Sequence, residues 1–212
     1  QVSPFGARGA NTGIQDVDNL VWKLKLVLDG AAPVGLLDSY DDERGVAADD
    51  NLLNSTRSTD FITPKNNASR RFRDAVLELA AHEPFARSLI NSGRLSTPTP
   101  YRASALNTPD GDVFAGEMHP GTNCVDAPVV REGQPAWFLD AIGDGFTVVV
   151  FGEAPDGAPP TCGGVTARVL SVGRDLTDAQ GVLAQRYDAR AGTTYLIRPD
   201  QHVAARWRRF DR

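Results

Sequence analysis

The sequence predicts an α/β protein, α+β in its overall arrangement, in which a helical first half precedes a half that mixes strands and helices. After Asn11 the apolar residues recur at helical spacing, whereas residues 146–151 form a continuous β-branched and aromatic run. Between the halves, residues 95–112 are rich in Pro, Thr, Ser and Asn, which is typical of a linker or a long surface connection. We therefore expect a helical part over residues 1–94, a linker over 95–118 and an α/β domain over 119–212.

Composition and charge narrow the class of protein. The 212 residues include 22 basic and 27 acidic side chains, which gives a net charge of −5, and 41% of the residues are apolar. These proportions exclude collagen, a coiled coil and a disordered acidic tail, and the negative balance argues against a nucleic-acid partner. No apolar run approaches the roughly 20 residues that span a bilayer, and no signal-peptide pattern is present. We expect no membrane partner and a cytoplasmic location.

The first predicted helix begins at Asn11-Thr12 and ends at Asp29-Gly30, where glycine suits the left-handed position after a helix end. One of its faces carries apolar residues at helical spacing: Ile14, Val17, Val21, Leu24 and Leu28. Further apolar residues widen this surface around most of the circumference: Leu20, Trp22, Leu26 and Val27. A helix this apolar must be covered on several sides.

Three more helices are expected in the first half. The second runs from Pro33, which suits a first turn, to Leu53, and shorter ones cover residues 69–81 and 84–91. The exposed side of the second helix is predicted to be acidic: Asp38, Asp41, Asp42, Glu43, Asp49 and Asp50. We interpret this side as a solvated face and not as a metal site, because Arg44 lies among the acids. Arg70, Arg71 and Arg73 lack interleaved aromatic residues and are interpreted as a surface patch.

The second half has the pattern of a small α/β sandwich. Strands are predicted over residues 146–151, 167–172 and 194–198, and Pro199-Asp200 turns the last of these into a hairpin with residues 202–207. Thr177-Asp178-Ala179-Gln180 fits a capping box, which predicts a helix from there to Tyr187.

Cysteine and histidine residues predict neither a metal site nor a catalytic triad. Cys124 and Cys162 form no C-x-x-C and are expected to be free thiols. His119 near Cys124 supplies two ligand types without a third, and His82 and His202 are isolated. No catalytic residue and no metal ligand is therefore predicted.

The informative segment is a glycine-rich loop, residues 3–13, that leads directly into a helix. A helix N-terminus offers unpaired N–H groups and the positive end of a dipole, so it favours an anion or an electron-rich ligand edge. No Lys-Ser/Thr follows the glycines and no strand precedes them, which excludes a Walker loop and the G-x-G-x-x-G fingerprint. On these residues alone, a tight turn closed by Asn11 as the N-cap remains the alternative.

The longer string is Pro4-x-Gly6-x-x-Gly9-x-Asn11-Thr12-Gly13-Ile14-Gln15-Asp16, followed by Asn19-Leu20-x-Trp22-Lys23-Leu24. It resembles the single-component FAD-dependent aromatic-ring hydroxylases, the phenol and 3-hydroxyphenylpropionate hydroxylase relatives. Leu36-Leu37-Asp38-Ser39-Tyr40, Glu43-Arg44 and the stretch around Asn51 extend the resemblance to about residue 57. The chain departs from the family at Ala7, Ala10, Gly45 and Val46, where relatives usually have Gly, Met, Arg and Pro.

The resemblance implies FAD as cofactor, NAD(P)H as co-substrate, and hydroxylation of a small phenolic or aromatic substrate by O2 through a flavin C4a-hydroperoxide. The implied cofactor-binding residues are Pro4, Gly6, Gly9, Ala10 and Asn11. Backbone N–H groups of Gly9, Ala10 and Asn11 would face flavin N1 and O2, and Pro4 would lie near the edge where oxygen adds. The resemblance also implies that the family's dinucleotide-binding segment lies upstream. The chain is then the helical C-terminal part of a flavin-binding domain with a further domain, and is expected to be inactive alone.

The second half resembles, more weakly, the thioredoxin-like C-terminal domain of phenol hydroxylase relatives. The matching stretches are Pro120-Gly121, Asp126-Ala127-Pro128, Gly145-Phe146-Thr147 and Tyr195-Leu196-Ile197-Arg198-Pro199-Asp200. Because C-x-x-C is absent, we interpret this domain as structural or as the support of a homodimer. The alternative is a stand-alone, non-catalytic thioredoxin-like chain that acts as an interaction scaffold.

Overall fold

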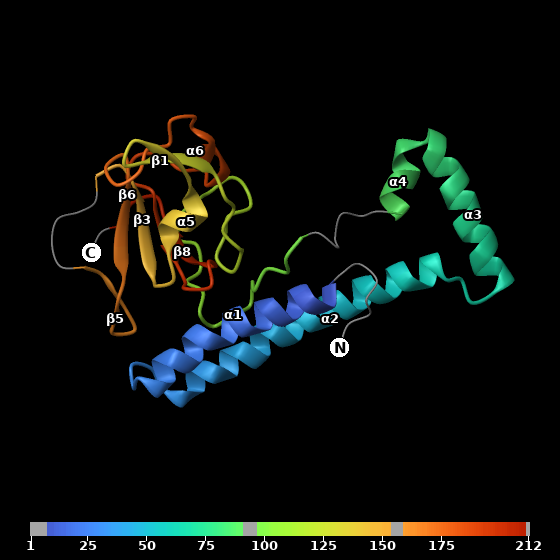
Figure 1. Ribbon diagram of the computed structural model, residues 1–212, viewed down its shortest axis with the longest axis horizontal. Coiled ribbons are helices and arrows are strands. Elements are labelled where there is room, and N and C mark those ends of the chain that lie inside the picture. Colours follow the sequence, from blue (N-terminus) through green and yellow to red (C-terminus); the bar gives the residue numbers. More distant parts are fainter. Residues whose placement is uncertain (1–7, 91–96, 154–158, 211–212) are drawn as a thin grey trace. The chain divides into compact units, whose positions relative to one another are not determined.

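The computed structural model describes residues 8–90, 97–153 and 159–210 (Figure 1). Its fold is mixed α/β, with a helical N-terminal part followed by small mixed sheets, as the sequence predicts. Two compact units can be distinguished: one comprises Gln1–Asp18 and Arg44–Thr99, the other Asn19–Glu43 and Pro100–Arg212. The two long helices each contribute residues to both units.

The helical elements are α1 (Arg8–Leu28), the 3-10 turn η1 (Val34–Leu37), α2 (Asp38–Ile62), α3 (Asn67–His82) and α4 (Pro84–Ile90). The predicted end of α1 is confirmed, because Gly30 adopts φ +70° directly after it. Pro33 lies at the N-cap of η1, so the second predicted helix begins with a 3-10 turn. Asn66 caps α3 by accepting a hydrogen bond from the Ser69 N–H at 2.8 Å.

The second unit contains the strands and two short helices. The strands are β1 (Pro128–Arg131), β2 (Gln134–Trp137), β3 (Thr147–Phe151), β4 (Thr161–Cys162), β5 (Val165–Thr166), β6 (Arg168–Val172), β7 (Thr194–Ile197) and β8 (Val203–Trp207). The helices are α5 (Phe138–Ile142) and α6 (Val182–Arg186). The main sheet has the order β6-β3-β7-β8, in which β3 and β6 are parallel and the other neighbours are antiparallel. The three predicted strands and the final hairpin are confirmed.

Strand β3 is buried along its whole length, as its continuous apolar run predicts. Val149 and Phe151 join the larger core, where Phe138, Tyr187 and Tyr195 also lie. The alternate residues Val148 and Val150 belong to a second cluster, formed with Phe146 and Ala167 and packed by Trp22 and Leu26 of α1. The second half of α1, from Asn19 on, is part of the sheet unit, where Trp22 and Leu26 pack against this second cluster.

The capping box predicted at residues 177–180 is wrong. Helix α6 begins only at Val182, after Gly181 in a left-handed conformation with φ +69°. Thr177 instead exchanges two backbone hydrogen bonds with Val130, at 2.9 and 2.8 Å, which fixes it in an extended bridge. The Asp178 carboxylate accepts a hydrogen bond from the Ala184 N–H at 2.8 Å. Asp178, and not the predicted cap Thr177, therefore provides a partner for an N–H group at the start of α6.

Candidate functional site

The start of α1 carries the described part of the predicted cofactor site. Because α1 begins at Arg8, the residues Gly9, Ala10 and Asn11 lie within its first turn, and all three are exposed. The prediction that Asn11 is the N-cap is wrong, since the helix begins three residues earlier. Pro4 and Gly6 lie outside the described residues.

This first turn fits an electron-rich ligand edge. The first N–H groups of a helix have no partner within the helix, and the dipole gives this end a partial positive charge. The first turn of α1 contains no acidic residue that would repel an anion. Gly9 and Ala10 leave little side-chain bulk over the N–H groups. The donor set therefore suits the pyrimidine edge of a flavin, which carries negative charge when the flavin is reduced.

Polar contacts hold the next turns of α1 against α2 within the first unit. Arg44 Nε forms an ion pair with Asp16 Oδ1 at 2.6 Å, and Arg44 Nη2 donates to the Thr12 carbonyl at 3.4 Å. Asn51 Nδ2 donates to Thr12 Oγ1 at 3.1 Å. Arg44 and Asn51 are buried, so the side chains that α2 contributes to these three contacts are shielded from water. They fix the turns that directly follow the exposed first turn.

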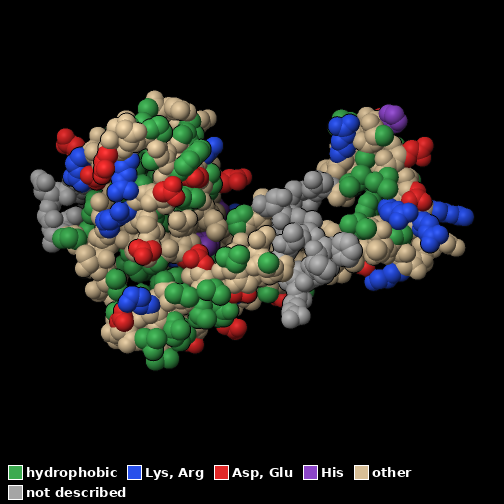
Figure 2. All heavy atoms as spheres, viewed as in Figure 1, with side chains coloured by type: hydrophobic (Ala, Val, Ile, Leu, Met, Phe, Trp, Pro, Cys, Tyr) green, Lys and Arg blue, Asp and Glu red, His purple; other side chains and the backbone are tan. Residues whose placement is uncertain are grey.

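The predicted apolar face of α1 is exposed. The exposed fractions are 68% for Ile14, 60% for Val17, 55% for Val21, 38% for Leu24 and 76% for Leu28. Figure 2 shows apolar side chains gathered along the two long helices. No described residue covers this stripe, although monomeric proteins rarely expose a continuous apolar surface of this kind.

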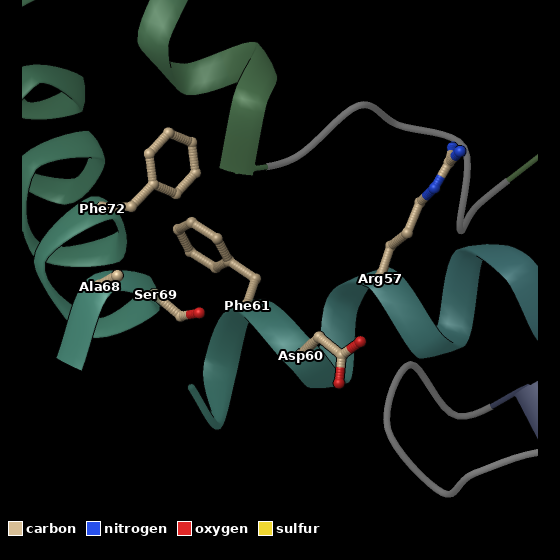
Figure 3. A pocket seen from close by; sticks show the side chains of 6 residues that line it. All are labelled: Arg57, Asp60, Phe61, Ala68, Ser69 and Phe72. Atoms are coloured by element: carbon tan, nitrogen blue, oxygen red, sulfur yellow. The ribbon is translucent and has the colours of Figure 1, made fainter. Parts of the chain in front are cut away.

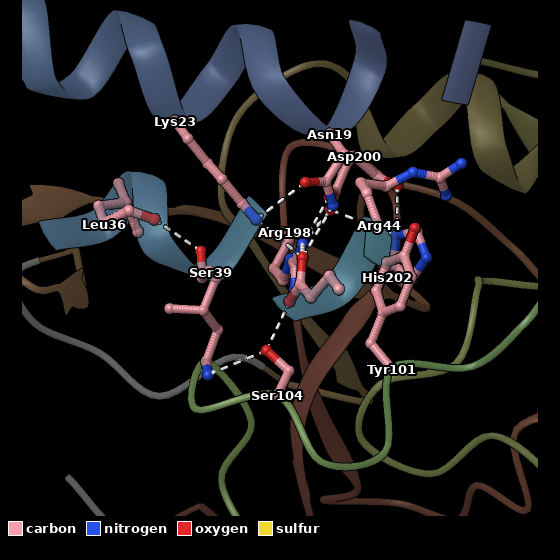
Figure 4. Close-up of polar contacts among 12 residues, drawn as sticks. Asn19, Lys23, Leu36, Ser39, Arg44, Tyr101, Ser104, Arg198, Asp200 and His202 are labelled. Atoms are coloured by element: carbon pink, nitrogen blue, oxygen red, sulfur yellow. Dashed lines mark hydrogen bonds and ion pairs between the residues drawn. The ribbon is translucent and has the colours of Figure 1, made fainter. Parts of the chain in front are cut away.

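A buried ion cluster lies at the other end of the α1–α2 hairpin, inside the sheet unit (Figure 4). Arg198 forms a bidentate pair with Glu43, at 2.6 and 2.9 Å, and also contacts both carboxylate oxygens of Asp200. Lys23 Nζ lies 2.8 Å from Glu43 Oε2. These four side chains are at most 3% exposed and carry two positive and two negative charges. We name them the ion cluster: Lys23, Glu43, Arg198 and Asp200.

Three further polar side chains, Asn19, Ser104 and His202, surround the ion cluster. Asn19 donates to Glu43 at 2.8 Å and to Asp200 at 3.2 Å, and it accepts from Lys23 at 2.8 Å. Ser104 donates to the other oxygen of Glu43. His202 lies beside Asp200, with Nδ1 2.8 Å from the Asp200 carbonyl oxygen.

The charges in the ion cluster are mutually stabilised. Burial by itself would raise the pKa of Glu43, but the hydrogen bonds and charge of Arg198 outweigh it and lower that pKa to about 2. The pKa of Asp200 is likewise lowered despite burial, by His202 and Arg198. Burial lowers the pKa of Lys23, and the neighbouring Glu43 opposes that shift. A carboxylate that accepts this many donors stays ionised at neutral pH.

The ion cluster corrects one sequence expectation. Glu43 was expected on the solvated acidic face of the second helix, but only 2% of it is exposed. Helical spacing separates it from Asp42 by 100°, so a neighbour in sequence lies on a different face. The sequence predicts only a strand end at Arg198 and a turn at Asp200. No local pattern pairs Arg198 with Glu43, which lies 155 residues away.

A pocket of about 530 Å³ lies in the first unit, lined by Arg57, Asp60, Phe61, Ala68, Ser69 and Phe72 (Figure 3). The rings of Phe61 and Phe72 point toward each other from α2 and α3. Phe72 is 63% exposed, so the pocket is an open hollow between helices and not an enclosed binding chamber.

Both cysteines are free thiols, as predicted. Among the described residues, no group of three His, Cys, Asp or Glu side chains is arranged to hold a metal ion. Of the helices that the structure describes, none combines the length and the apolar character needed to cross a lipid bilayer.

The first comparison concerns the fold. It matches the crystal structure of the flavin-dependent monooxygenase PieE in complex with FAD and substrate, with a TM-score of 0.72 and 24% sequence identity. The match covers 99% of this chain and 43% of that chain. At this level of identity the comparison shows a shared fold, which is part of a flavin-dependent monooxygenase fold.

Sequence comparisons then show which proteins the chain is similar to. A profile described as FAD binding domain matches residues 1–55. The chain is 30% identical to a putative polyketide hydroxylase of Streptomyces halstedii over 98% of its length, which covers 39% of that relative. It is also 30% identical to a 3-(3-hydroxy-phenyl)propionate/3-hydroxycinnamic acid hydroxylase of Mycolicibacterium gilvum, over 93% of the chain and 38% of the relative. Over nearly its whole length the chain is similar to these hydroxylases, and its first 55 residues match the FAD binding domain profile. The chain spans about two fifths of the length of these curated relatives.

Proposed function

We propose that this chain is part of an FAD- and NAD(P)H-dependent monooxygenase that hydroxylates a small phenolic or aromatic substrate with O2. One observation carries the proposal. The first turn of α1 is exposed, contains no acidic residue, and lies inside the segment that matches the FAD binding domain profile. A helix end of this kind stabilises a negative charge that develops on a bound ring.

The residues of the first turn would act through their backbone. The N–H groups of Gly9, Ala10 and Asn11 would donate toward N1 and O2 of the flavin, and Pro4 and Gly6 would extend the site along the loop. When bound, FAD supplies hydride acceptance and the activation of oxygen. The part of these residues is to orient the ring and to stabilise its negative charge.

The exposed stripe of α1 supports the idea that further flavin-binding structure packs there in the working enzyme. Five large apolar side chains between Ile14 and Leu28 are 38–76% exposed in the isolated chain. We expect the 212-residue chain alone to bind FAD weakly and to be inactive. We further propose that residues 119–212 form a thioredoxin-like domain with a structural or dimer-supporting role. The cytoplasmic location stays a prediction from the sequence.

Titration with FAD tests this proposal. The full-length protein that contains this chain should bind FAD stoichiometrically and oxidise NADPH or NADH faster when a phenolic ring is added. Product analysis should show one oxygen atom from O2 incorporated into the ring. A full-length protein that binds no FAD would refute the proposal and would favour the non-catalytic scaffold instead.

A further inference from the structure

We propose that two buried side chains of α2, Arg44 and Asn51, are positioning residues for the cofactor site. Through Thr12 and Asp16 they fix the rotation of α1 and thereby the placement of its first turn. This inference rests on the proposed function, because it assigns a purpose to the precise placement of that turn. The turn and the residues that hold it all belong to the first compact unit.

Three contacts join these side chains to α1 close to its first turn. Arg44 Nε pairs with Asp16 Oδ1 at 2.6 Å, and Arg44 Nη2 donates to the Thr12 carbonyl at 3.4 Å. Asn51 Nδ2 donates to Thr12 Oγ1 at 3.1 Å. Thr12 directly follows Asn11, and Asp16 lies five residues after Asn11, which is about 7.5 Å along the helix axis. The contacts therefore act on the turns next to the proposed donors.

Helix α2 holds both positioning side chains on one buried face. Arg44 is 5% exposed and Asn51 is 6% exposed, and Ala47, which lies between them at helical spacing, is 2% exposed. Packing restricts the rotamers of buried side chains, so their donor atoms point in fixed directions. Arg44 and Asn51 also lie inside residues 1–55, the segment that matches the FAD binding domain profile and that contains the first turn.

The two faces of α1 show why its rotation has to be fixed. Thr12 and Asp16 are partly buried and contact α2, whereas Ile14 is 68% exposed and Val17 is 60% exposed. Burial of apolar surface is favourable in water, so the apolar face by itself favours a rotation of α1 toward α2, which the polar contacts oppose. A rotation of about 20° would move a backbone atom that lies about 2.3 Å from the axis by about 0.8 Å. Functional sites tolerate only about 0.5 Å of displacement.

Two other roles predict different properties of the bound flavin. A purely structural role lowers stability and leaves the flavin unchanged. A direct effect of charge makes the potential more negative when the Arg44 cation is lost, more positive when the Asp16 anion is lost, and unchanged when the neutral Asn51 is lost. A positioning role makes the potential more negative in all three cases, because each loss displaces the donors that stabilise the reduced flavin.

The chain offers a matched control in the pair of Arg206 and Asp110. Their side chains are 5% and 30% exposed, compared with 5% and 37% for Arg44 and Asp16. Arg206 also donates to a backbone carbonyl, that of Met118, as Arg44 does to Thr12. Asp110 and Met118 lie outside α1 and α2, so loss of the Arg206 side chain removes a similar set of contacts without touching the two long helices.

The test uses the full-length, FAD-loaded protein that contains this chain, with the variants Arg44→Met, Asp16→Ala, Asn51→Leu and Arg206→Met. We measure the melting temperature and, well below the melting range, the Kd for FAD and the midpoint potential of the bound flavin. The first three variants should raise the Kd about tenfold and make the potential more negative. Arg206→Met should lower the melting temperature and leave both flavin properties unchanged. Thr12→Val, which removes only the hydroxyl that Asn51 contacts, replaces any variant that fails to fold.

The outcomes separate the two proposals. If the wild-type protein binds FAD and the three variants lose stability without any change in Kd or potential, the positioning role is refuted and the proposed function stands. A more positive potential in Asp16→Ala, with no change in Asn51→Leu, would also refute it, because charge alone would explain both results. Equal flavin changes in Arg206→Met would refute it as general destabilisation. If the wild-type protein binds no FAD, the proposed function fails and the inference fails with it.

Discussion

The carboxylate of Glu43 and the guanidinium of Arg198, 155 residues apart in sequence, form a bidentate ion pair with N–O distances of 2.6 and 2.9 Å. Both side chains are 1% exposed. The pair ties the second turn of α2 to the end of β7. The sheet unit therefore includes the connected end of the α1–α2 hairpin, residues 19–43, which the order of the elements alone would assign to the first half. The stability of the sheet unit therefore depends on residues from distant parts of the chain.

Two lysines on α1 give a direct test of burial. Lys23 is fully buried against Glu43, whereas the Lys25 side chain is 71% exposed in its pair with Asp29. Lys23→Met should lower the free energy of unfolding by about 3 kcal/mol, since it leaves a buried carboxylate short of one cation. Lys25→Met should change it by less than about 0.5 kcal/mol. Urea unfolding followed by circular dichroism measures both; equal losses would contradict the buried cluster.

The ion cluster predicts a specific acid sensitivity. The pKa of Glu43 is about 2 in the folded chain, compared with 4.5 for a glutamate without partners, as in the unfolded chain. The stability that this carboxylate contributes is therefore fully present above pH 4.5. That stability is lost as the pH falls from 4.5 toward 2, because the unfolded state then binds the proton more readily. Unfolding free energies measured across this range should fall steeply for the wild type and less steeply for Glu43→Gln. Parallel slopes would show that other carboxylates cause the loss.

Two glycines should respond in opposite ways to a methyl group. Gly45 lies within α2, and a Cβ there meets no atom within 4 Å, so Gly45→Ala should stabilise the chain by about 1 kcal/mol. Gly121 has φ +90°, and its Cβ would lie 2.5 Å from the Tyr101 carbonyl oxygen. Gly121→Ala should therefore cost at least about 2 kcal/mol. Thermal unfolding of both variants tests this, and stabilisation by Gly121→Ala would refute the close contact.

The two thiols should differ in reactivity. Cys124 is buried in the main core, and burial raises its pKa to about 12. Burial also raises the pKa of Cys162, but this side chain is partly exposed, so a reagent can reach its thiol. Ellman's reagent should modify one thiol in the folded chain and two in 6 M guanidinium. Peptide mapping should place the single native modification at Cys162, and the variant Cys162→Ser should show none. Rapid modification of Cys124 in the folded chain would contradict its burial.

Local patterns predicted the elements whose causes are local. The end of α1 at Gly30 and the buried strand β3 follow from backbone freedom and from an apolar run, so both were predictable. The hairpin β1–β2 was missed because its turn, Glu132-Gly133, has positive φ at both residues without the Asn-Gly or Asp-Gly pair that usually marks it. Thr177 was misassigned because its long-range pairing with Val130 overrides a local capping pattern.

The candidate site at the start of α1 could be predicted from the sequence, whereas the ion cluster could not. A glycine-rich loop before a helix indicates an anion site. The structure places Gly9, Ala10 and Asn11 in the first turn of α1, and their role in cofactor binding stays a prediction. The ion cluster was not predictable, because Glu43 and Arg198 meet only through the tertiary fold. Periodicity shows which helix face is polar, but it does not show which single carboxylate on that face is buried against a distant strand.

The central claim is that the first turn of α1 stabilises the anionic reduced flavin through its backbone. Ala10→Pro removes one N–H from a turn where proline is tolerated, and Ala10→Ser keeps that N–H with a similarly small side chain. The most direct measurement is the midpoint potential of FAD bound to the full-length protein that contains this chain. Loss of one charge-assisted hydrogen bond, about 1.5–3 kcal/mol, should make the potential of Ala10→Pro about 30–65 mV more negative. Ala10→Ser should match the wild type, and equal potentials for all three proteins would contradict the claim.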